Sequence, residues 1–188
     1  MMLGLGLPLL LGALAAQAGA PTGLPLKLDA IAINLSNVGR PGPTWVHITI
    51  ERWSTDEERD KLRDALIEKG PDALMEAVKN VKPRVGFIST GSSLGWDIRY
   101  SREHVLPTGA RRVVIATDRP MRIWEVANGA RSADYDFTLA EIHITPDGQG
   151  EGKLVPMAKI RYNKDQRAIE IENYSSEPVR LGEVKVTK

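Results

Sequence analysis

WVHITIERW, residues 45–53, alternates apolar and polar side chains along most of its length. An extended chain places every second residue on the same side, so one side consists of Val46, Ile48 and Ile50. The other side consists of His47, Thr49 and Glu51. This pattern is typical of a strand with one face in a core and one face in solvent. We predict such a strand here, with Ile48 in the core and with His47 and Trp53 on a surface open to a ligand.

Outward from this strand, β-rich segments recur along the chain between residues of the turn-forming types Gly, Pro, Asn and Asp. They span residues 26–35, 84–89, 96–101, 111–117, 121–126, 137–144, 153–162, 168–173 and 180–186. Short strands at regular spacing are typical of an antiparallel sandwich or barrel. We expect the last four segments to form a meander of successive hairpins.

One helical stretch interrupts the strands directly after Trp53. Two overlapping capping-box patterns mark its start, Ser54 with Glu57 and Thr55 with Glu58. Gly70 ends it, and Pro71 can begin a second helix. The sequence therefore predicts a mainly β (α+β) protein, an antiparallel β sandwich or barrel of about eight to ten strands with a short helix pair near residues 55–80.

Composition excludes several classes of function. The 188 residues include 25 Lys and Arg against 24 Asp and Glu, which leaves no basic excess for nucleic acid. The absence of Cys excludes a disulfide, a zinc thiolate and a cysteine nucleophile. We expect no nucleic-acid partner and no cofactor.

The N-terminus resembles an export signal. Residues 3–16 form an apolar run too short for a membrane span, which needs ~20 residues, and no charged residue precedes Lys27. Small residues follow the run, so we expect residues 1–20 to be a signal peptide cleaved near Ala18 or Ala20. The remaining residues 21–188 then form a single β-rich domain, secreted or periplasmic, with no stable membrane span.

A serine hydrolase is one alternative, because Gly91-Ser92-Ser93-Leu94-Gly95 matches the nucleophile-elbow pattern. Ser93 would be the nucleophile, with His104 or His143 as base and Asp118 or Glu141 as acid. An elbow is followed by a helix, however, whereas residues 96–100 alternate as a strand does. The sequence context therefore contradicts the catalytic interpretation.

A metal-binding module is the second alternative, with ligands His47, His104, His143 and Glu141. These residues lack the close pairs typical of metal sites, so we assign no metal. Glu141 and His143 share one face of the segment 137–144, and we favour a solvated position for both because buried ionisable groups are uncommon unless paired.

Asp97 and Arg99 share one face of another strand. They can form cross-strand ion pairs, which contribute ~0–1 kcal/mol when exposed, or they can contact a ligand. The candidate ligand-binding residues are therefore Asp97, Arg99, His47 and Trp53.

Several stretches together resemble a group of secreted bacterial proteins of unknown function. They are Ile50-Glu51-Arg52-Trp53-Ser54, residues 84–88, residues 93–100, residues 115–120 and Glu172-Asn173-Tyr174. The resemblance covers about residues 45–186. It implies an exported bacterial protein and brings no activity, cofactor or catalytic residue.

The leading hypothesis is an exported, non-enzymatic binding or structural module of the cell envelope. Its expected partner is a small molecule, a peptide or another envelope component. The serine hydrolase and the histidine-based metal module remain the alternatives.

Overall fold

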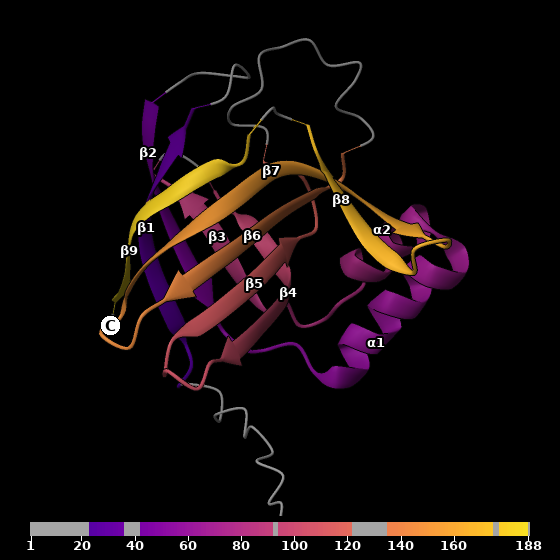
Figure 1. Cartoon of the computed structure of the whole chain (residues 1–188), viewed down its shortest axis with the longest axis horizontal. Helices are drawn as coiled ribbons and strands as arrows, with labels where there is room; N and C mark the ends of the chain where they lie inside the picture. The colour runs from indigo at the N-terminus through magenta and orange to yellow at the C-terminus, as the bar shows by residue number, and fades with distance from the viewer. Residues whose placement is uncertain (1–22, 36–41, 92–93, 122–134, 175–176, 188) are drawn as a thin grey trace, which may run out of the picture.

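The computed structural model describes residues 23–35, 42–91, 94–121, 135–174 and 177–187 (Figure 1). The strands are β1 (Leu26–Asn34), β2 (Gly42–Ile50), β3 (Gly86–Thr90), β4 (Trp96–Val105), β5 (Arg111–Thr117), β6 (Phe137–Ile144), β7 (Gln149–Asn163), β8 (Ala168–Asn173) and β9 (Val179–Thr187). The helices are α1 (Asp56–Asp64), a π-helical turn (Ala65–Lys69) and α2 (Pro71–Lys79). The predicted signal peptide lies outside the described residues, as does the predicted strand over residues 121–126 beyond Met121.

The strands form a closed antiparallel barrel. The order around it is β6-β5-β4-β3-β2-β1-β9-β7, and β7 returns to pair with β6. Closure leaves none of these eight strands with a full unpaired edge, which is how barrels avoid edge-to-edge association. The prediction of a mainly β protein with a short helix pair is confirmed, and the barrel is the correct one of the two architectures.

Large aliphatic side chains fill the barrel. Val46, Ile48 and Ile50 of β2 are at most 1% exposed, while His47 faces outward. Their neighbours in the interior include Leu28, Ile88, Ile98, Ile115, Ile142, Leu154 and Leu181. The predicted register of the strand at residues 45–53 is therefore confirmed, although β2 begins three residues earlier and ends at Ile50.

The predicted meander of the last four strands is wrong at β9. β7 is 15 residues long, which is enough for two strands to pair with one of its edges, one after the other. Its first part, Gln149–Leu154, pairs with β9, and its second part, Ala158–Asn163, pairs with β8. β9 therefore pairs with β1 and closes the barrel, instead of pairing with β8. Residues 159–163 and 168–172 extend past the barrel as a two-stranded arm, which Figure 1 shows reaching the helices.

The helix pair packs against the outside of the barrel beside this arm. Thr55 is the N-cap of α1 and forms a capping box with Glu58, the second of the two predicted patterns. Gly70, at φ +91°, separates the π-helical turn from α2, which begins at Pro71 as predicted. The helices bury a second apolar cluster outside the barrel that includes Leu62, Leu66, Leu74, Val78 and Phe137. Neither helix of the described chain is long and apolar enough to cross a membrane.

Candidate functional site

The outer wall of the barrel changes character along β4, β5 and β6. Toward the helix pair it presents Tyr100, Ala116 and Leu139, which are cross-strand neighbours in one row. Two residues further along the strands, the next row is Arg102, Val114 and Glu141. The row after that is His104, Arg112 and His143. The outer face of these strands is therefore apolar beneath the helices and charged beyond them.

An apolar groove lies between this wall, the helices and the arm. The wall contributes Tyr100, Val114, Ala116, Phe137 and Leu139. The helices contribute Leu62, Leu66, Leu74 and Val78, with Arg59 and Arg63 of α1 at the polar margin. The arm contributes Ile160, Ile169 and Ile171. The volume of the groove is about 330 Å³, which falls within the range of small-ligand sites.

Two isoleucines of β8 are the exposed part of this groove. Ile169 is 53% exposed and Ile171 is 57% exposed, although both line the groove. Apolar surface left in water costs about 25 cal/mol per Å² relative to its burial. A ligand that covers both side chains would recover part of that free energy.

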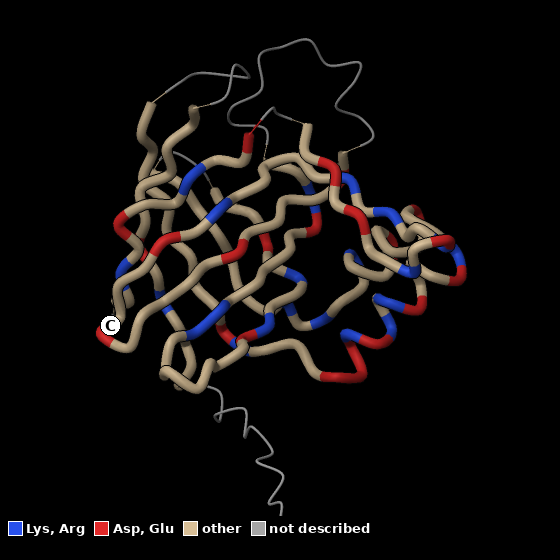
Figure 2. Tube along the Cα trace, viewed as in Figure 1, with Lys and Arg blue, Asp and Glu red and all other residues tan. Residues whose placement is uncertain are grey.

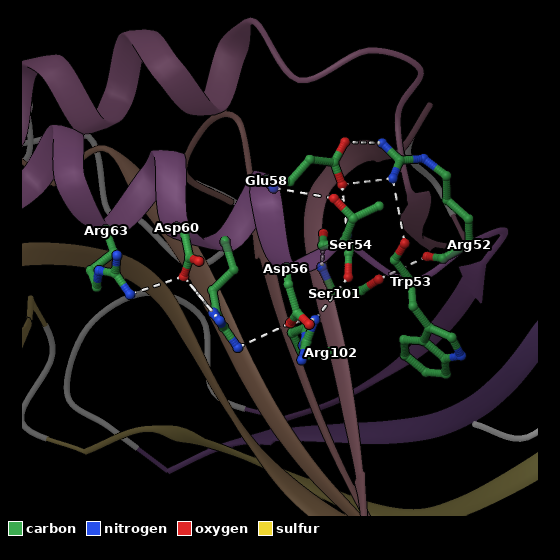
Figure 3. A network of polar contacts seen from close by, with 11 residues as sticks. Arg52, Trp53, Ser54, Asp56, Glu58, Asp60, Arg63, Ser101 and Arg102 are labelled. Carbon is green, nitrogen blue, oxygen red and sulfur yellow. Dashed lines mark hydrogen bonds and ion pairs between the residues drawn. The ribbon is translucent and has the colours of Figure 1, made fainter. Parts of the chain in front are cut away.

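The two arginines at the groove margin are already paired with carboxylates of α1. Arg59 lies 3.1 Å from Asp56 and 2.9 Å from Asp60, and Arg63 lies 2.9 Å from Asp60. The Asp60 pKa is lowered by its hydrogen bond from Arg59. These pairs make the helix side of the margin close to neutral (Figure 3).

Tyr100 lies where the apolar and charged parts of the wall meet. Burial raises the pKa of Tyr100, so its phenol is protonated at neutral pH. Its hydroxyl has no hydrogen-bond partner among the residues that the structure describes, and it lines the groove. The hydroxyl can therefore donate to, or accept from, a polar atom of a ligand.

The predicted metal ligands His47 and His143 belong to separate ion pairs in the described part of the chain. His47 pairs with Asp29 at 2.7 Å, and His143 pairs with Glu141 at 2.7 Å, on the outside of different strands. The solvated position expected for Glu141 and His143 is confirmed, with their side chains 48% and 55% exposed. Over the described ranges of the chain, no group of three or more His, Cys, Asp or Glu could hold a metal ion.

Ser93 lies outside the described residues. The chain that follows it enters strand β4 at Trp96, and a nucleophile elbow needs a helix there. The structure thus agrees with the strand predicted after this motif, which contradicts a nucleophile elbow.

Asp97 and Arg99 belong to a structural network of charges at one end of the barrel. Arg99 lies 2.9 Å from Asp97 and 3.3 Å from Asp118, and it donates to the Val81 carbonyl at 3.0 Å. Arg84 joins Asp97 to Glu51 at 3.1 Å each. The predicted ion pairs between neighbouring segments are present, and they connect β4 to Asp118, directly after β5, and to Arg84, two residues before β3.

A neighbouring network holds the start of α1 against β4 (Figure 3). Arg52 donates to both carboxylate oxygens of Glu58, at 2.8 and 2.9 Å. Ser54 accepts from the Ser101 backbone N–H at 3.1 Å, and Arg102 donates to the Ser54 carbonyl at 3.1 Å. Trp53, a predicted ligand residue, is partly buried and packs against the cluster inside the barrel.

None of the residues that line the groove is among the predicted ligand residues. Phe137 and Leu139 share a strand face with Glu141 and His143, for which the sequence predicts a solvated position. The change from apolar to charged residues along this face of β6 is the sequence signal that could have indicated a groove there. Comparison of the chain with protein-family models, curated proteins and solved structures gives no match.

Proposed function

We propose that this protein is an exported, non-enzymatic binding module that holds an apolar small molecule in the groove between its helix pair, its arm and its barrel wall. The observation that carries the proposal is the groove itself, a volume of about 330 Å³ lined almost entirely by apolar side chains and bordered by the exposed Ile169 and Ile171. Concave apolar sites with a few polar groups are the common form of small-molecule sites.

The location of the groove separates it from the filled barrel. Barrels that carry ligands often hold them inside, whereas this interior is occupied by residues such as Ile48 and Ile115, each at most 1% exposed. The space for a ligand is instead outside the barrel, in the groove that α1, α2 and the arm form with the wall. The helix pair and the arm are thus the parts of the fold that the proposal assigns to binding.

Binding is testable with a neutral fluorescent probe such as N-phenylnaphthylamine, whose emission rises in apolar surroundings. We expect saturable binding to the purified protein, and Ile169→Ser or Ile171→Ser should weaken it about threefold to tenfold because each removes apolar contact area. Both residues are exposed, so neither change should lower the free energy of unfolding by more than about 0.5 kcal/mol.

Leu94→Ser is the matched control, because Leu94 is fully exposed and does not line the groove. It should leave the probe affinity unchanged. Equal affinities for the wild type and both isoleucine variants would contradict the proposal.

Export is the second part of the proposal and rests on the apolar run at residues 3–16. Intact-mass measurement of protein produced in a bacterium should show a mature chain that begins near Gly19 or Pro21. A full-length chain retained in the cytoplasm would contradict it.

A further inference from the structure

The groove continues into a second, polar hollow on the same wall of the barrel. This hollow has a volume of about 310 Å³ and shares Tyr100 and Val114 with the apolar groove. Its other lining residues are Arg102, Glu103, His104 and Arg112. A molecule that extends from one hollow to the other would therefore pass from an apolar lining to a polar one with two arginines.

Arg112 is the cation of this hollow that is left without a carboxylate. Arg102 is occupied by Asp56 at 2.9 Å and by the Ser54 carbonyl. The side chain of Arg112 is exposed and makes no ion pair or hydrogen bond with any residue in the described ranges. Its guanidinium can therefore accept an anionic partner without first losing another.

The two carboxylates closest to Arg112 in the sheet, those of Glu141 and Glu103, contact other residues. Glu141, diagonal to Arg112 across β5 and β6, accepts from His143 at 2.7 Å. Glu103 on the neighbouring strand has a side chain only 1% exposed, which lies 3.2 Å from Arg111. The positive charge of Arg112 is thus not neutralised by a direct contact from either side.

We infer that the ligand of the proposed groove is a single-chain amphiphile with a carboxylate head group, such as a fatty acid of medium length. The alkyl chain lies in the apolar groove, and the carboxylate lies at Arg112 with the Tyr100 hydroxyl beside the junction. This assignment rests on the proposed function, since it needs the groove to be a binding site. Figure 2 shows acidic and basic positions interspersed over the molecule, so the preference for an anion comes from this local contact.

Decanoate and decanol distinguish binding in the apolar groove from recognition of a carboxylate at Arg112, because they share an alkyl chain and differ in the charge of the head group. Displacement of the fluorescent probe gives both affinities at low ionic strength. Arg112→Gln should weaken decanoate about twofold to fivefold, the range expected for one exposed charge pair, and leave decanol unchanged. Arg112→Lys should retain most of the decanoate affinity, and added salt should weaken decanoate alone.

Arg180→Gln is the matched control, since Arg180 is an exposed arginine of the barrel wall on β9 and lies outside both hollows. It should change neither affinity. If decanol binds and Arg112→Gln alters both ligands equally or neither, the carboxylate assignment is wrong while the apolar groove stands. If the probe binds and neither compound displaces it, the inference fails while the groove stands, and if the probe itself does not bind, the proposed function fails together with the inference.

Discussion

Glu58 shows how one residue joins the helix pair to the barrel. Its carboxylate accepts from both terminal nitrogens of Arg52 and from the Thr55 backbone N–H at 3.0 Å. The hydrogen bond from Arg52 holds the pKa of Glu58 below its usual value. The contact therefore joins the chain after β2 to the first turn of α1, and its strength depends on the carboxylate being ionised.

Glu58→Gln should lower the free energy of unfolding by about 1 kcal/mol at neutral pH, because glutamine keeps an acceptor for the cap and loses the charge that attracts Arg52. A carboxylate whose pKa is lowered by folding adds stability above its unfolded pKa of about 4.3, and that stability is lost as the pH falls through the folded value. Urea denaturation should thus show the difference at about pH 7, and the difference should shrink as the pH falls below about 4.3. A difference that persists unchanged in acid would assign the effect to packing instead of charge.

At the scale of the element, the register of β2 is the feature on which the barrel depends. Ile48 faces the interior opposite Leu28 of β1 and Ile88 of β3, whereas Thr49 is partly exposed. Ile48→Ala should cost ~2–5 kcal/mol by leaving a cavity, and Thr49→Ala should cost within about 0.5 kcal/mol. Denaturation midpoints measured for the two variants check this, and similar midpoints would contradict the register.

The elements differ in how far their sequences predict them. β6 is predicted with its correct bounds at Phe137–Ile144, because its β-rich residues lie between the turn-forming residues Asp136 and Pro146. α2 is predicted to begin at Pro71 because a proline fits the first turn of a helix. The pairing of β9 with β1 and β7 is not predicted, since alternation identifies a strand and its faces but carries no information about which distant strand lies beside it.

The same limit applies to the molecule as a whole. The sequence predicts the candidate residues Asp97, Arg99, His47 and Glu141 because ionisable side chains on one face of a strand can contact a ligand. The structure places these four residues in ion pairs outside the barrel interior. The groove depends on long-range packing of the helices and the arm against the wall, which the local change from apolar to charged residues on one face of β6 does not by itself predict. The isoleucines of β8 illustrate this, because they resemble ordinary strand residues until the arm is seen to extend past the barrel.

The proposed ligand binds outside the barrel, and methyl NMR during a decanoate titration locates its position. Methyl signals of Ile169, Ile171 and Leu62, which line the groove, should shift in a saturable way. Signals of Ile48 and Ile115, which are buried in the barrel interior, should move far less. Larger shifts at Ile48 and Ile115 than at Ile169 and Ile171 would place the ligand inside the barrel and contradict the account.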